Sequence, residues 1–153
     1  RSFSYNELFL EINRVAASGH LKSCRLTDTA VLIDIIACPF GREGGGRPWF
    51  AMAKTAQTAM MKALAKKDYL AKDGITFNSV APGAIMIPDT GWEKMLKEKP
   101  KELEEFIKNE LPLGRLGRPE EIADVVAFIC SEKAALLNGA SIPIDGGQGG
   151  SLL

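Results

Sequence analysis

The sequence predicts an α/β fold in which a parallel β-sheet is connected by helices. Three short apolar runs, at about residues 30–36, 75–80 and 141–145, have the composition of strands. The first of them is β-branched and nearly continuous, as in strands that are buried on both faces of a parallel sheet. Helical stretches separate the three runs, and this alternation is typical of α/β proteins. We therefore expect parallel strands with right-handed crossover helices.

Length and composition are those of one globular domain over residues 1–153. Hydrophobic residues make up 46% of the chain and charged residues 25%, and the formal net charge is +0. Because no basic block is present, we expect no nucleic-acid binding. No apolar run of about 18 residues occurs, so we expect no membrane insertion. The three cysteines are an odd number without metal-ligand spacing, which predicts reduced thiols in the cytoplasm and no metal site.

The first predicted element is a helix that begins at Ser4. Glu7 follows three residues later, and this spacing is that of a capping box in which both side chains satisfy early helical N–H groups. Apolar residues then recur on one side, and the helix is expected to end near Ser18-Gly19 or Leu21, since glycine is common just past helix ends.

A long helix from Trp49 to about Lys67 follows the strand at 30–36 and a glycine-rich loop. It is rich in alanine and methionine and is apolar nearly all round, which indicates burial on more than one side. A sheet covers only one face of such a helix. The second cover is either another part of this chain or another subunit, and we expect an oligomer formed through this helix.

Four further features follow in order. They are the strand at 75–80 with the turn Ala81-Pro82-Gly83-Ala84-Ile85, a charged helical segment at 88–111, a run at 112–123 that enters the last helix, and a final strand before Asp145-Gly146-Gly147. Pro119 is expected at the first helical position, where its missing N–H costs nothing.

This order of motifs resembles the short-chain dehydrogenase/reductase family, and in particular its 3-oxoacyl reductase-like members. The resemblance rests on Lys54 in the long helix, on Pro82-Gly83, on the run at 112–123 and on the terminal Asp-Gly-Gly. It covers nearly the whole chain but only the second half of the family's domain. It therefore implies three strands from the C-terminal half of a Rossmann-like parallel sheet, with the N-terminal half absent.

The resemblance also implies the catalytic positions. Lys54 matches the family's lysine, but Phe50 stands four residues earlier, where the family has its tyrosine. The family's catalytic serine maps to Cys38, with Ala37 as the alternative. Asn13 matches the asparagine that holds a proton-relaying water in the family, and a polar residue on a solvated helix face is the equally weighted alternative.

The cofactor implied by the resemblance is NAD or NADP. Lys54 would hold its ribose, and backbone groups of Pro82, Gly83, Ala84 and Ile85 would hold the nicotinamide, because glycine lets the backbone approach the ring closely. The glycine-rich turn that anchors the pyrophosphate is not found in this sequence, which predicts weak cofactor binding. The segment at 88–111 matches the family's substrate lid over a small carbonyl or acyl substrate, or else is a plain surface hairpin.

Two functions remain open at this point. The first is an NAD(P)-dependent carbonyl/alcohol oxidoreductase that is impaired, since a phenyl ring at Phe50 has no proton to transfer and the Cys38 thiol is a weak donor. The second is a non-catalytic interaction or oligomer-forming subunit of an active relative, a pseudoenzyme that associates through the Trp49–Lys67 helix.

Overall fold

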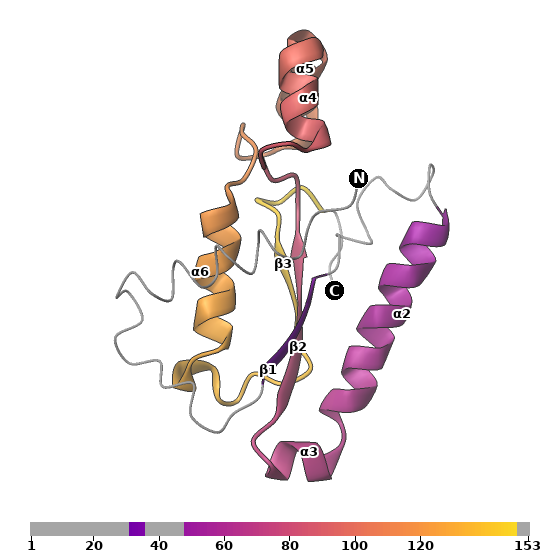
Figure 1. The fold of residues 1–153 in the computed structure, drawn as a ribbon, viewed down its shortest axis with the longest axis vertical. Helices are drawn as coiled ribbons and strands as arrows, with labels where there is room; N and C mark the ends of the chain where they lie inside the picture. Colours follow the sequence, from indigo (N-terminus) through magenta and orange to yellow (C-terminus); the bar gives the residue numbers. More distant parts are fainter. Residues whose placement is uncertain (1–30, 36–47, 150–153) are drawn as a thin grey trace.

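The computed structural model describes residues 31–35 and 48–149, which are built around a three-stranded sheet (Figure 1). The strands β1 (Val31–Ile35), β2 (Thr76–Pro82) and β3 (Ser141–Ile144) are parallel and lie in the order β1-β2-β3. This confirms the predicted α/β fold with a parallel sheet. The central strand β2 runs past its expected end at Val80, because Ala81 and Pro82 still pair with β3.

Helices cover both faces of the sheet. α2 (Pro48–Ala65) lies on one face and α6 (Pro119–Ile129) on the other (Figure 1). The core between β2 and α6 is apolar throughout and consists of Val80, Ile85, Ile87, Ile122, Val126 and Ile129. On the opposite face, Met61 of α2 is 1% exposed. The middle of β2 is thus buried from both sides, as expected for a central parallel strand.

The long helix ends earlier than the sequence predicts. α2 stops at Ala65 rather than at about Lys67, and a separate short helix, α3 (Asp68–Lys72), follows it. The break lies at Lys67, whose φ of −82° and ψ of 110° are extended rather than helical. Gly74, with a φ of 74°, then turns the chain into β2, a conformation that favours glycine.

The charged segment after β2 is a helical hairpin. α4 (Gly91–Glu98) and α5 (Pro100–Glu110) stand beyond the carboxyl end of β2, at the top of Figure 1. The two helices are joined by an apolar contact between the rings of Trp92 and Phe106, whose centroids are 5.0 Å apart. Helical structure here confirms the prediction for 88–111. No helix among the described residues is long and apolar enough to cross a membrane.

Two asparagines tie the sheet to the turn before β3. The fully buried Asn78 donates its amide to the Leu137 carbonyl at 2.9 Å and accepts the Ala140 N–H at 3.0 Å. Asn138 accepts the Phe77 N–H and donates to the last residue of α2, Ala65, each at 3.0 Å. Because buried polar groups are costly unless paired, these bonds hold β3 in register beside β2.

Candidate functional site

The candidate site is the loop that leaves the carboxyl end of β2. In open α/β sheets, ligands bind outside the carboxyl ends of the strands, and all the strands here point their carboxyl ends the same way. The loop Gly83–Met86 is held on one side by the turn before α6 and on the other by the residues that follow β3. These two contacts decide which backbone groups the loop can offer to a ligand.

Three of the four N–H groups of this loop donate hydrogen bonds within the chain. They are Gly83 N–H to Ile144 O at 3.1 Å, Ala84 N–H to Gln148 Oε1 at 2.9 Å, and Met86 N–H to Gly117 O at 2.9 Å. The N–H of Ile85 has no hydrogen-bond partner among the residues that the structure describes. Ile85 and Gly117 form an isolated parallel bridge, in which the residues that flank Ile85 make the bonds. Ile85 therefore directs its own N–H and C=O away from Gly117.

Gly83 is required by packing inside the chain. A Cβ built on it would lie 2.7 Å from the Cβ and 2.8 Å from the Cα of Asp145, and 2.8 Å from Gln148 Oε1. Such distances are too short for carbon atoms, so any side chain would displace the segment after β3. The sequence analysis explains a glycine at position 83 by the close approach of a cofactor ring. The tight packing against Asp145 explains it independently of any cofactor.

Asp145 organises the segment that reaches the loop. Its Oδ1 accepts the Gly147 N–H and its Oδ2 accepts the Gly149 N–H, both at 2.9 Å. Gly146 and Gly147 have φ values of 64° and 84°, a backbone region that other residues rarely adopt. The Asp-Gly-Gly motif is thus a tight turn that carries Gln148 back to Ala84.

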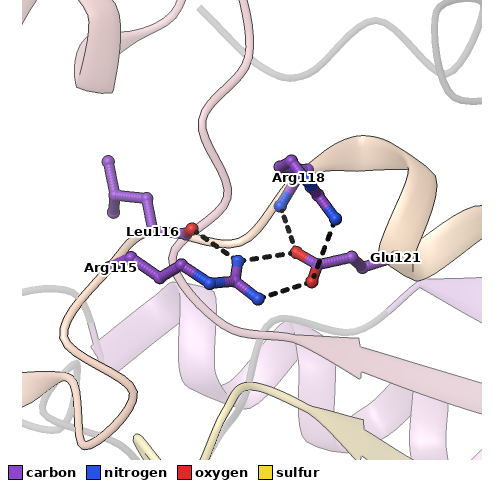
Figure 2. A network of polar contacts seen from close by, with 4 residues as sticks. All are labelled: Arg115, Leu116, Arg118 and Glu121. Carbon is purple, nitrogen blue, oxygen red and sulfur yellow. Dashed lines mark hydrogen bonds and ion pairs between the residues drawn. The ribbon is translucent and has the colours of Figure 1, made fainter.

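The turn before α6 holds the other side of the loop. Gly117 donates its N–H to the Ala84 carbonyl at 2.9 Å. The carboxylate of Glu121, in the first turn of α6, also holds this segment by accepting hydrogen bonds from Arg115 and Arg118 (Figure 2). Glu121 accepts from Arg115 Nη2 at 2.6 Å, from Arg115 Nη1 at 2.9 Å and from the Arg118 backbone N–H at 2.8 Å. The glutamate thereby closes both the arginine-glycine turn and the start of α6.

These contacts change the ionisation of Glu121. Hydrogen bonds from Arg115 and then from the Arg118 N–H lower the pKa of its carboxyl from 4.5 to about 2. Both interactions favour the charged form of the carboxyl, as expected for a carboxylate beside a guanidinium. The same pair raises the pKa of Arg115, so the ion pair persists across the neutral range.

We expect Glu121→Gln to lower the free energy of unfolding at neutral pH by about 1–2 kcal/mol, because a charge-assisted network that is partly exposed to solvent is lost. The folded-state pKa lies below the unfolded one, so this stabilisation is complete above about pH 4.5 and is lost as the pH falls toward 2. Urea unfolding of both proteins at a series of pH values measures the difference.

Glu120→Gln is the matched control for this experiment. Glu120 lies in the same turn of α6, and its side chain makes no hydrogen bond or ion pair with the described residues. Its replacement is expected to change stability by less than about 0.5 kcal/mol. A Glu121→Gln difference that stays constant between pH 7 and pH 2 would contradict the assigned network.

Lys54 lies on the face of α2 that packs on the sheet. It is half-buried and stands seven residues, about two helical turns, before the buried Met61. Because α2 runs antiparallel to β2, its first turns lie toward the carboxyl end of β2 (Figure 1). Lys54 thus lies on the sheet side of α2, toward the carboxyl end of β2, and its role in cofactor binding stays a prediction.

The other predicted catalytic positions are described only in part. Phe50 lies in α2 one turn before Lys54, so both positions share one side of the helix, but only its backbone is described. Asn13 and Cys38, with the alternative Ala37, lie outside the described residues. Of the predicted cofactor-binding residues, Pro82 ends β2 and is half-buried, while Ala84 and Ile85 are buried.

A small cavity adjoins the loop beside the segment that follows α5. Its volume is about 130 Å³, and its walls include Ile85, Leu111, Arg115, Ile122 and Asp145. Most ligand pockets have volumes of about 300–1,000 Å³. This cavity by itself is therefore too small for a dinucleotide. No group of three or more histidine, cysteine, aspartate or glutamate side chains in the described part of the chain could hold a metal ion.

Sequence reasoning missed Gln148 and the role of Glu121. Glu121 lies three residues after Arg118, the capping-box spacing, and that signal could have identified it as the residue that closes the turn. Gln148 contacts a residue 64 positions away, and no local pattern marks it.

Comparison with known protein families gives a match over residues 23–148 to the family described as enoyl-(acyl carrier protein) reductase. The chain is 48% identical over 98 residues to an uncharacterized oxidoreductase of Bacillus subtilis, covering 64% of this chain and 37% of that protein. It is 41% identical over 103 residues to the 3-oxoacyl-[acyl-carrier-protein] reductase of Pseudomonas aeruginosa, covering 67% of this chain and 38% of that protein. The chain thus spans well under half the length of these relatives.

Among solved structures, the fold is similar to that of YwfH, an NADPH-dependent reductase involved in bacilysin biosynthesis. The TM-score is 0.67 at 29% sequence identity, and the match covers 78% of this chain and 47% of that protein. In this comparison too, the chain corresponds to part of a longer fold.

Proposed function

The chain belongs to the short-chain dehydrogenase/reductase family, since the family match extends over residues 23–148, and we propose that it holds the nicotinamide end of NAD(P) in a carbonyl/alcohol oxidoreductase. The observation that carries this proposal is that three N–H groups of the loop are paired, whereas the Ile85 N–H has no partner within residues 31–35 and 48–149. A nicotinamide carboxamide has one carbonyl acceptor and an NH₂ donor. The Ile85 N–H and C=O together are complementary to it.

Lys54 supports the same role. Its position on the sheet side of α2, toward the carboxyl end of β2, suits an ammonium group that donates to ribose hydroxyls. The solved relative YwfH is NADPH-dependent, which favours a nicotinamide cofactor for this chain as well. The bound cofactor would supply the hydride. The residues of this chain would orient the ring and the ribose.

We further propose that this chain is catalytically impaired. In the family, a tyrosine transfers the substrate proton and a serine steadies the carbonyl oxygen. Phe50 and Cys38 stand at the matching positions, a ring with no acidic proton and a weak thiol donor. With cysteines that lack disulfide or metal spacing, a cytoplasmic location is proposed alongside this function.

The cofactor proposal is tested by adding NADPH or NADH to the isotope-labelled chain and following backbone amide signals by NMR. We expect the Ile85 amide to shift most and the amides of Gly83, Ala84 and Met86 to shift less, because these three N–H groups already donate hydrogen bonds within the chain. Weak binding remains visible by this method. An Ile85 signal that does not move at millimolar concentrations of either cofactor would overturn the proposal.

A second candidate role, subunit association, is favoured by the outer face of α2. Met52 is 72% exposed and Met60 is 57% exposed, so the described residues leave much of this apolar helix uncovered. The exposed alanines beside them on α2 are Ala53, Ala56, Ala59 and Ala63. Contiguous apolar surface of this kind is typical of protein interfaces. The proposed partner is a second copy of the chain or another member of the family.

We expect Met60→Asp to raise the dissociation constant of this assembly at least about 10-fold, because a charge would be buried without a partner. Since Met60 is already 57% exposed in the single chain, its own fold should tolerate the change. Sedimentation velocity at several concentrations measures the assembly. Leu136→Asp, at a residue that is 99% exposed and outside α2, is the matched control and should leave association unchanged. A wild-type chain that stays monomeric at high concentration would exclude this role.

A further inference from the structure

We propose that Gln148 is a positioning residue for the cofactor loop: its side-chain carbonyl fixes Ala84 so that the next residue, Ile85, presents its N–H to the nicotinamide. This inference rests on the proposed role of Ile85 in cofactor binding. It adds a residue from beyond β3 that controls the geometry of that site.

The contact itself is direct. Gln148 Oε1 accepts the Ala84 N–H at 2.9 Å, and the Ala84 side chain is buried. A buried N–H that loses its acceptor raises the free energy of the folded state. The hydrogen bond to Gln148 therefore disfavours rotation of the peptide group between Gly83 and Ala84. The Ile85 N–H belongs to the same peptide plane as the Ala84 C=O, which accepts the Gly117 N–H, so it points away from Gly117. Gln148 holds the preceding peptide plane, and Ala84, which joins the two planes, is therefore fixed from both sides.

Gln148 is itself held in place. Its backbone N–H donates to the Asp145 carbonyl at 3.2 Å, and the Asp145 carboxylate accepts the N–H groups of the glycines on either side of Gln148. The near contact between Gly83 and Asp145 leaves this turn no room to shift toward the loop. The acceptor is thus presented from a rigid support rather than from a free surface side chain.

Ala84 is bound on its other side by Gly117, which accepts from Met86 and donates to the Ala84 carbonyl. Loss of Gln148 would leave this second attachment intact. We therefore expect a change at Gln148 to loosen the loop locally and to leave the sheet folded. This separates a positioning role from a general contribution to stability.

The test uses two substitutions and one control. Gln148→Met keeps the length of the side chain but removes the carbonyl acceptor, whereas Gln148→Glu keeps an acceptor oxygen at the same distance along the chain. Asn109→Leu is the control, since Asn109 is an exposed amide on α5 with no side-chain hydrogen bond to the described residues. All three proteins are compared with the wild type by amide hydrogen exchange and by ligand titration, both followed by NMR.

In hydrogen exchange, we expect the Ala84 amide to exchange about 2- to 10-fold faster in Gln148→Met, the range expected for losing one hydrogen bond. Gln148→Glu should restore most of the protection, and Asn109→Leu should match the wild type. Unchanged exchange at Ala84 in Gln148→Met would overturn the inference. This measurement needs no cofactor.

In titrations, NADPH is compared with 2′,5′-ADP, a fragment that lacks the nicotinamide. Gln148→Met should weaken NADPH binding about 2- to 10-fold and leave the fragment unaffected, because only the nicotinamide contacts the loop. Equal weakening of both ligands would show a general structural effect and overturn the positioning role. If the Ile85 signal of the wild-type chain did not shift on addition of NADPH, the proposed function would be overturned. Hydrogen exchange at Ala84 would then still test the contact between Gln148 and Ala84.

Discussion

The chain is expected to transfer no measurable hydride from NADPH to short 3-oxoacyl thioesters. Phe50 lies one helical turn before Lys54, and we have proposed that it stands where the family carries its proton-donating tyrosine. Removal of a general acid commonly lowers the rate about 10²- to 10⁴-fold. If the serine position is Cys38 or Ala37, as the resemblance implies, the rate would be lower still. The assay is the loss of NADPH absorbance in the presence of substrate.

Phe50→Tyr would restore a phenol beside Lys54, whose positive charge would lower the pKa of the phenol. Even so, we expect little recovery from this substitution alone, because the weak donor proposed at the serine position remains. Phe128→Tyr, on the exposed side of α6, is the control for adding a phenol elsewhere. Turnover by the unmodified chain would show that the interpretation of Phe50 is wrong. Cofactor binding without turnover, rescued by Phe50→Tyr, would identify a disabled enzyme.

Gly83→Ala is expected to lower the free energy of unfolding by about 1–3 kcal/mol, the usual range for overpacking. The new Cβ would stand 2.7 Å from Asp145 Cβ and 2.8 Å from its Cα, and backbone atoms move only at a cost. The φ of Gly83 is not in the positive region, so the effect would come from the steric contact alone. Urea unfolding measures the loss.

The matched control is Gly91→Ala, at the first residue of α4. Nothing lies within 4 Å of a Cβ built there, and its φ is also not positive. This variant should be neutral or slightly more stable, since alanine favours the helix and glycine does not. If Gly83→Ala were as stable as Gly91→Ala, the tight packing of the segment after β3 against the loop would be refuted. Gly83→Ala should also weaken the Ala84–Gln148 bond, and hydrogen exchange at Ala84 would show this.

The elements that the sequence predicted well are those with strong local signals. The apolar run of β2 and the proline at the start of α6 mark their elements without reference to the rest of the chain. The end of the long helix was predicted less well. Lys66 and Lys67 are good helix formers, so nothing local predicts the extended backbone at Lys67 that separates α2 from α3.

In the candidate site, too, some features could be predicted from local sequence and others could not. Lys54 and the turn at Pro82 and Gly83 could be found because the residue types and their order along the chain carry the resemblance. The structure adds that Lys54 is half-buried on the sheet side of α2, and its role stays a prediction. Which N–H groups of the loop are paired could not be foreseen from the sequence. Their acceptors belong to Ile144, Gly117 and Gln148, which lie far from the loop along the chain.

The sequence by itself determined the family and the α/β class, and it is the basis of the proposal that Phe50 stands in place of a phenol. Those properties belong to single residues or to patterns within one segment. Only the tertiary structure decided which backbone groups of the loop are occupied and why Gly83 has no room for a side chain. Every peptide carries the same donor and acceptor. Whether a given N–H or C=O group forms a hydrogen bond within the protein therefore depends on which groups of other segments lie beside it in the folded chain.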